Sequence, residues 1–164
     1  MTTMRGLVQR VEQASVVVRA VDDDGARTGE EELAGQIGHG LCVLVGAGKS
    51  DDQAAALKLA DKIWNLRVFS DDAGAMNLSL ADRLEAGAAA EVLVVSQFPL
   101  YGDTRKGRRP SFVDAAPPDV AEPLVGVVVD RLRALGATVG TGRFRTDMAV
   151  SLVNDGPVTL LLEV

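Results

Sequence analysis

Val153-Asn154-Asp155-Gly156-Pro157-Val158-Thr159 is the stretch around which the rest of the sequence is organised. It joins two apolar runs, 148–153 and 158–164, that have the composition of strands. Asn-Asp-Gly-Pro is typical of a tight turn, and a turn between two strands is the simpler interpretation. Glycine has no side chain, and the peptide bond before proline can be cis at modest cost. A Gly-Pro step could therefore instead present two backbone carbonyls to an ammonium group. Both interpretations stay open on this stretch alone.

Several separated motifs accompany this stretch. In chain order they are Gln9-Arg10-Val11, Arg67-Val68-Phe69, Met76-Asn77, Ser96-Gln97-Phe98, Arg109-Pro110-Ser111-Phe112 and 154–159. Together they resemble the D-aminoacyl-tRNA deacylase family, also described as D-tyrosyl-tRNA deacylases, over nearly the whole chain. The resemblance implies a homodimeric, tRNA-binding hydrolase that acts in chiral proofreading during translation. It would release D-amino acids from D-aminoacyl-tRNAs and glycine from mischarged glycyl-tRNA(Ala). The alternative is a noncatalytic module that binds the 3′ end of tRNA.

The resemblance assigns catalysis to Ser96, Gln97 and Phe98, which follow the strand-like run 92–95. Backbone N–H groups at a strand end could hold the ester and its developing oxyanion. Without the other motifs, Ser-Gln at a strand end would be ordinary loop polarity. The family commonly has threonine next, whereas this chain has Pro99, which offers neither a hydroxyl nor an N–H. We therefore expect a positioned water and the ribose hydroxyl of the substrate to act; the alternative is an impaired enzyme.

The resemblance also implies a set of substrate-binding residues. Gly156 and Pro157, joined by a cis bond and supplied by the partner subunit, would hold the α-amino group and exclude L side chains. Arg10 would brace that loop. Phe144 and Met148 would line a pocket for the terminal adenosine, although residue type alone places both more simply in the core.

The charge pattern restricts nucleic-acid binding to a local patch. The chain has 17 basic and 23 acidic residues and a net charge of −6, which argues against a broad nucleic-acid surface. A basic cluster nevertheless follows the Ser-Gln-Phe motif and consists of Arg105, Lys106, Arg108 and Arg109. Such a run is often a solvated loop. Its position beside the suspected site favours a patch that binds one end of the tRNA.

The sequence gives little support for a metal, a cofactor or a catalytic cysteine. Cys42 is the only cysteine and lies in the apolar run 41–45, which predicts a buried structural thiol and no disulfide. His39 is the only histidine, and its flanking glycines indicate a turn. One histidine and one cysteine close together do not make a usual metal site. We therefore expect no metal and no cofactor.

The stretch Val45-Gly46-Ala47-Gly48-Lys49-Ser50 is similar to a phosphate-binding loop, which would make the protein a nucleotide hydrolase. The first glycine of that pattern is replaced by Val43, and two acidic residues at 51–52 would repel a phosphate. We favour instead a helix over 51–65 with Ser50 as its N-cap and both acids complementing the helix dipole.

The remaining sequence predicts more strands than helices. Strands are expected at 4–19, 32–37, 41–45, 91–95, near 138 and in the two C-terminal runs; helices are expected at 51–65 and 118–135, with a weak helix or loop at 81–90. These elements predict an α/β (α+β) fold with a mixed, mostly antiparallel, barrel-like sheet and two main helices packed on it. We expect a single domain over 1–164. Without a signal-peptide pattern or an apolar run long enough to span a bilayer, we expect a cytoplasmic protein.

Overall fold

In the computed structural model, which describes residues 3–164, the long strand β1 (Arg5–Val21) is the element on which the sheet is built. Along one edge it pairs antiparallel with β8 (Asp147–Glu163) from end to end. Along its other edge it pairs antiparallel first with β3 (Gly40–Gly46) and then with β2 (Arg27–Ile37). Alternating apolar and polar residues predict a long strand here, and the structure confirms it.

The other half of the sheet is parallel. Strand β6 (Glu91–Ser96) pairs with β3, and β7 (Thr138–Thr141) pairs with β6, which gives the order β2-β1-β3-β6-β7 with β8 on β1. The sheet curves until β2 approaches β7. At that contact a Cβ on Gly35 would lie 2.7 Å from the carbonyl oxygen of Thr141, so only glycine permits it. The predicted mixed, barrel-like sheet is confirmed.

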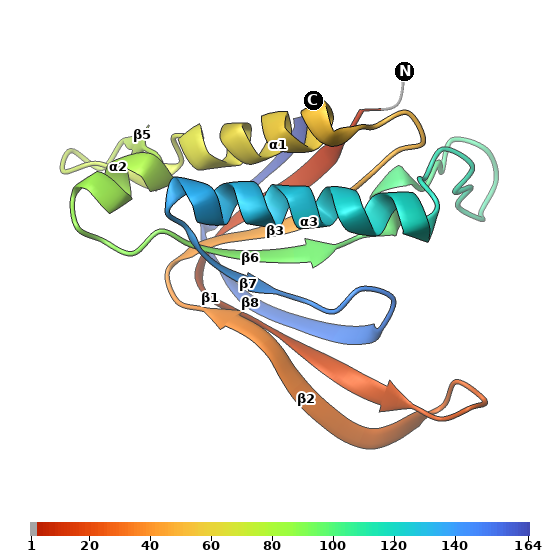
Figure 1. Ribbon diagram of the computed structural model, residues 1–164. Helices are drawn as coiled ribbons and strands as arrows, with labels where there is room; N and C mark the ends of the chain where they lie inside the picture. Colours follow the sequence, from red (N-terminus) through yellow and green to blue (C-terminus); the bar gives the residue numbers. More distant parts are fainter. Residues whose placement is uncertain (1–2) are drawn as a thin grey trace.

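Two long helices cover one side of the sheet, α1 (Gln53–Asn65) and α3 (Pro118–Leu135), and they lie side by side in Figure 1. Each buries one apolar stripe against the strands. The buried residues are Ala56, Leu59, Ala60, Ile63 and Trp64 in α1, and Ala121, Leu124, Val128, Val129 and Leu132 in α3. Helix α3 ends where Gly136 takes a left-handed conformation with φ of 113°, as its position after the last apolar residue predicts.

The predicted N-cap of the first long helix needs correction, whereas the helix or loop expected over 81–90 is confirmed as a short helix. The N-cap of α1 is Asp52, whose carboxylate accepts the N–H of Ala55 at 2.9 Å, and not Ser50. The helix starts later because the carboxylate of Asp51 turns back and accepts the N–H of Gly48 at 2.6 Å. Over 81–90, a short helix α2 (Leu80–Glu85) forms behind a capping box made by Ser79. It follows the small hairpin of β4 (Phe69–Ser70) and β5 (Met76–Leu78).

The expected turn between two C-terminal strands is wrong, because both runs belong to the single strand β8. Gln9 pairs with Thr159 and Val11 pairs with Asn154, so residues 155–158 bulge out of an otherwise continuous ladder. Both runs pair with β1 in the same direction, so the chain never reverses. The peptide bond between Gly156 and Pro157 is cis, as predicted. Within residues 3–164 no helix is long and apolar enough to cross a membrane.

Candidate functional site

A pocket of about 650 Å³ opens where β6 ends. Its walls are the 3-10 helix η1 (Phe98–Tyr101), the first turn of α3 with the segment before it, and the beginning of β8. Its lining residues include five that the sequence predicts as catalytic or substrate-binding: Ser96, Gln97, Phe98, Phe144 and Met148. The carboxyl end of a parallel strand is a common place for a binding site in folds with helices packed on the sheet.

The backbone at the start of η1 offers one amide to a ligand. Within the turn, Leu100 donates to the carbonyl of Gln97 at 3.2 Å and Gly102 donates to that of Pro99 at 2.9 Å, while the N–H of Gln97 donates to Val45 at 2.8 Å. The first amide of a helical turn has no acceptor inside the turn. Pro99 has no N–H at all. Of the amides at the start of this turn, the Phe98 N–H is therefore the one left to donate to a ligand.

Aromatic rings form part of the pocket wall. The rings of Phe98 and Phe112 are tilted by 59° with their centroids 5.0 Å apart, and both side chains are exposed. Phe144 is half-buried and packs against the main core as well as lining the pocket. Exposed rings beside a polar strand end provide flat apolar surfaces on which a planar base can stack.

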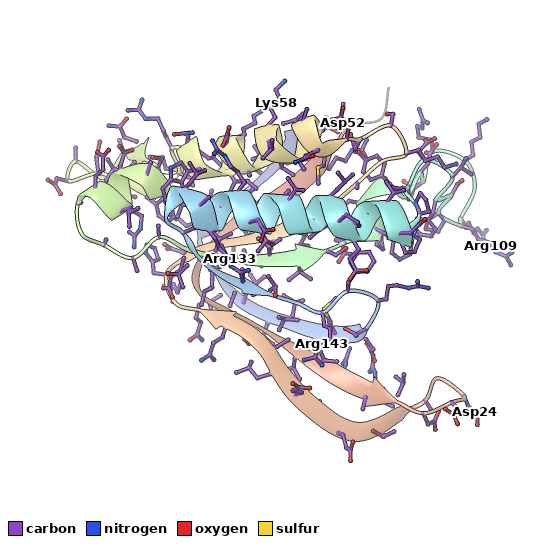
Figure 2. All side chains as sticks on the ribbon, in the orientation of Figure 1. Asp24, Asp52, Lys58, Arg109, Arg133 and Arg143 are labelled. Carbon is purple, nitrogen blue, oxygen red and sulfur yellow. The ribbon has the colours of Figure 1, made fainter. Side chains whose placement is uncertain are left out.

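Met148 and the loop before it close the other side. The Met148 sulfur accepts the N–H of Arg143 at 3.4 Å and packs on Gly142, where an added Cβ would lie 2.7 Å from the sulfur. Arg143, labelled in Figure 2, forms two hydrogen bonds of 3.0 Å each to the carboxylate of Glu32, and these bonds tie the loop to β2. Arg143 thus connects this wall of the pocket to two strands of the sheet, to β8 through Met148 and to β2 through Glu32.

Three further lining residues, Arg145, Thr146 and Asp147, escape prediction from sequence. Arg145 has φ of 59°, an uncommon backbone conformation for a residue other than glycine. Asp147 is bound by Arg27 at 2.7 Å and by Arg19 at 3.1 Å, and its pKa is lowered chiefly by the hydrogen bond from Arg27. The sequence around these polar residues matches no known motif, so it does not indicate a binding site. The positive φ of Arg145 is the one unusual feature of the segment, and only the structure reveals it.

Gly156 and Pro157 do not join the pocket of their own chain. Arg10, which contacts the bulge, pairs with Leu41 near the start of β3, whereas Ser96 pairs with Val45 near its end. Four residues of strand at about 3.3 Å each separate the two places by roughly 13 Å. The residues predicted for one site therefore lie in two groups at opposite ends of the sheet.

Hydrogen bonds from neighbouring side chains hold the bulge in place. The buried Arg10 donates from Nε to the carbonyl of Asp155 at 3.1 Å and from Nη1 to that of Val68 at 2.6 Å. His39 contacts the Asp155 carboxylate at 3.3 Å, a role that its predicted place in a turn does not reveal. Asn154 accepts the N–H of Val158 at 3.1 Å. Gly156 and Pro157 themselves are exposed.

The basic loop extends from the far end of the pocket, and Figure 2 shows Arg109 reaching away from the sheet. Arg105 forms hydrogen bonds of 2.9 and 2.7 Å to Asp103 and holds the pKa of that carboxyl at about 2. Its charge is therefore compensated locally. Lys106, Arg108 and Arg109 are exposed and dominate the positive field of this loop.

The loop that is similar to a phosphate-binding loop has no free cradle. The N–H of Gly48 donates to the carboxylate of Asp51 at 2.6 Å, and that of Lys49 donates to the carbonyl of Asp114 at 3.1 Å. Amides that already bind protein oxygens cannot surround a phosphate. The structure therefore disfavours the nucleotide-hydrolase interpretation.

Cys42 is buried in β3, and burial raises the pKa of its thiol to about 11. At pH 8 nearly all of the thiol is therefore protonated, and the protonated thiol is a poor nucleophile. We expect iodoacetamide to leave Cys42 of the native protein unmodified and to alkylate it fully in denaturant, as measured by mass spectrometry. Rapid alkylation of the native protein together with loss of activity would contradict a purely structural thiol.

Comparison with known proteins gives consistent matches over the whole chain. A family model described as D-Tyr-tRNA(Tyr) deacylase matches residues 7–163. A D-aminoacyl-tRNA deacylase of Roseiflexus sp. (strain RS-1) is 53% identical over 98% of this chain and 93% of its own length. A protein of the same name from Streptomyces coelicolor is 52% identical over 98% and 100%.

Two solved structures are also similar. The c-Myc DNA Unwinding Element Binding Protein superposes with a TM-score of 0.80 at 36% identity, covering 98% of both chains. A probable eukaryotic D-amino acid tRNA deacylase superposes with a TM-score of 0.78 over 99% of this chain and 100% of its own, at 18% identity. The second likeness shows a shared fold alone.

Proposed function

The chain belongs to the D-aminoacyl-tRNA deacylase family, and on that premise we propose that it hydrolyses the ester between a D-amino acid and the terminal ribose of tRNA. The observation that carries the proposal is the pocket at the end of β6, which combines the free amide of Phe98 with aromatic walls. Its volume of about 650 Å³ lies within the range of sites that enclose small molecules. Such a pocket suits the aminoacyl-adenosine end of the substrate.

The proposed chemistry relies on position and not on a side-chain nucleophile. Water attacks the ester carbonyl and gives up a proton, the bond to the ribose oxygen breaks, and that oxygen takes up the proton, so the products are a free D-amino acid and tRNA. The Phe98 N–H donates to the carbonyl oxygen as negative charge develops there. Ser96 and Gln97 hold the ester and the ribose, whose neighbouring hydroxyl assists the water. Pro99 fits this scheme because the scheme asks nothing of position 99.

We propose that the partner subunit of a homodimer completes the site with its Gly156–Pro157 backbone. Two observations support this arrangement. The bulge projects at the opposite end of the sheet from the pocket of its own chain, and β8 exposes several large apolar side chains, for which a second copy is a suitable cover. These exposed side chains are Val150, Val153, Leu160 and Leu161. The bare carbonyls would hold the α-amino group.

Chirality follows from exclusion. An L side chain would collide with the backbone of the bulge, whereas a D side chain points outward. Glycine has no side chain to collide, so the same site would accept glycyl-tRNA(Ala). Because the site excludes any side chain in the L position, it would discriminate by configuration and not by which amino acid the tRNA carries.

The terminal adenosine would stack on the rings of Phe98 and Phe144, with Met148 beside them. The exposed Lys106, Arg108 and Arg109 would contact the nearby phosphates of the tRNA end. The acidic remainder of the surface restricts the contact to that end. We place this activity in a single domain over residues 1–164, and in the cytoplasm, where translation supplies aminoacyl-tRNA.

Purified protein is expected to release D-tyrosine from D-tyrosyl-tRNA and to leave L-tyrosyl-tRNA nearly intact. The measurement is a deacylation time course with both esters, beside a binding measurement on uncharged tRNA. Binding without release above the buffer rate would sink the proposal and favour the noncatalytic module that binds tRNA ends. Activity that survives a chelator would agree with chemistry that needs no metal.

A further inference from the structure

The loop between β3 and α1, residues 46–52, contacts both walls of the pocket and has no part in the proposed chemistry. On one side it meets η1. A Cβ on Gly46 would lie 3.0 Å from Cβ of Leu100 and 3.1 Å from the carbonyl oxygen of Gln97. The absence of a side chain at Gly46 therefore lets the turn that carries Phe98 sit directly on this loop.

A buried hydroxyl fixes that contact. Tyr101 is the last residue of η1 and is 4% exposed. Its hydroxyl donates to Oδ2 of Asp51 at 3.2 Å, and the same oxygen accepts the N–H of Gly48 at 2.6 Å. One carboxylate thus binds the turn and the loop together.

The same loop also holds the opposite wall. Ala47 accepts the N–H of Ala116 at 2.9 Å, Lys49 donates to the carbonyl of Asp114 at 3.1 Å, and Gly48 forms an isolated bridge with Ala115. Ala115 and Ala116, which precede α3, also line the pocket. The loop between β3 and α1 therefore binds two segments that line the pocket, η1 and residues 114–116.

Arg5 supports Tyr101 from the outer side. Its guanidinium carbon lies 4.6 Å from the centre of the Tyr101 ring, and Nη1 donates to the carbonyl of Leu100 at 2.8 Å. A salt bridge of 2.9 Å to Glu163 holds Arg5 in place. Burial, and after it the charge of Asp51, raises the pKa of Tyr101, so the phenol remains a donor at neutral pH.

We propose that Asp51 and Tyr101 are a positioning pair: they lock the β3–α1 loop to η1 and so fix where the Phe98 N–H stands relative to the opposite wall. The stretch that is similar to a phosphate-binding loop thereby has a function, which is to position the pocket. The catalytic part of this inference rests on the proposed function. The positional part does not, because the contacts exist without substrate.

The test compares Tyr101→Phe and Asp51→Ala with Asp52→Ala. Tyr101→Phe removes one oxygen and keeps the ring in the core. Asp52→Ala is the matched control, because it deletes the neighbouring carboxylate and the helix cap without touching the pocket. Loss of an N-cap costs roughly 1 kcal/mol of stability, so the control also reveals what destabilisation alone does.

The first readout is the amide NMR spectrum of the free protein. We expect Tyr101→Phe and Asp51→Ala to shift the Phe98 and Ala116 amide signals, and Asp52→Ala to shift that of Ala55 while sparing those two. Unchanged Phe98 and Ala116 signals in both variants would overturn the inference. This outcome is independent of whether the protein has deacylase activity.

The second readout is kinetic. Misplacement of a catalytic donor by a fraction of an ångström to 1 Å costs up to about 100-fold, so we expect kcat on D-tyrosyl-tRNA to fall about 10-fold in Tyr101→Phe and further in Asp51→Ala. Affinity for a nonhydrolysable amide analogue of the D-tyrosyl-adenosine end should change less than about threefold, because the donor acts on charge that develops in the transition state.

Three kinetic results are decisive. Wild-type kcat in Tyr101→Phe, or an equal fall in Asp52→Ala, would overturn the positioning role. A wild-type protein that neither binds the analogue nor releases D-tyrosine would refute the proposed function instead, and the amide signals would then decide the positional part alone.

Discussion

Gly156→Ala is expected to lower kcat/KM for D-tyrosyl-tRNA by about 100-fold, because a misplacement near 1 Å in a binding group has an effect of that size. The new Cβ would lie 2.9 Å from Cγ2 of Val158 and 3.0 Å from Nη2 of Arg10. Arg10 is buried and bound to two carbonyls, so it cannot yield. The bulge must therefore move, and the D ester loses the backbone that holds its amino group.

The matched control is Gly25→Ala. Gly25 also has a left-handed backbone, with φ of 82°, but nothing lies within 4 Å of its added Cβ, and it sits next to Asp24 in the hairpin tip (Figure 2), whereas the bulge pairs with Gln9 and Val11 much earlier in β1. Both variants carry the cost of an L side chain at positive φ, and only one disturbs the bulge. The measurements are kcat/KM on both esters and the thermal unfolding midpoint. If Gly156→Ala keeps the D-to-L ratio of the wild type, the stereochemical role of the bulge is wrong.

The bulge also shows what local sequence cannot decide. Asn-Asp-Gly-Pro has the same turn chemistry whether the chain reverses or continues. What prevents a reversal is β1, more than 140 positions away along the chain, which pairs with Thr159 on one side of the bulge and with Asn154 on the other. The sequence therefore predicts an irregular backbone at these residues. It does not predict that the chain continues in the same direction, because the pairing with β1 decides that.

The start of α1 shows the same division on a smaller scale. Ser50 and Asp52 are both good N-cap residues. The choice depends on Asp51, whose carboxylate is taken by Gly48 and Tyr101 and pulls the preceding residues out of the helix. Tyr101 is fifty positions away, so the helix boundary is set by a tertiary contact that no local pattern contains.

The candidate site was predictable where contiguous residues carry it. Ser96, Gln97 and Phe98 stand at the end of a strand that apolar composition predicts, and the structure places all three in one pocket. Arg145 and Thr146 were missed, because they reach the pocket through a backbone conformation that ordinary side chains do not signal. The distance between the pocket and Gly156 follows from strand register, which sequence alone does not give.

Phe98→Pro is expected to lower kcat by about 100-fold to 1,000-fold beyond the effect of Phe98→Ala, which is the cost of deleting one oxyanion donor. Phe98 is the first residue of η1, a position that accepts proline because its N–H has no partner within the turn. The substitution therefore removes the amide proposed to face the ester oxygen, at a helix-start position where proline is common.

Phe98→Ala separates the ring from the amide. It keeps the N–H and loses the stacking surface, so we expect mainly a higher KM, by about 10-fold for one lost base contact. The comparison is valid only while both variants show the same thermal unfolding midpoint and the same affinity for tRNA. Equal kcat in the two variants would mean that the oxyanion is stabilised elsewhere. Because Pro99 has no N–H to substitute for that of Phe98, this chain isolates the contribution of one backbone amide.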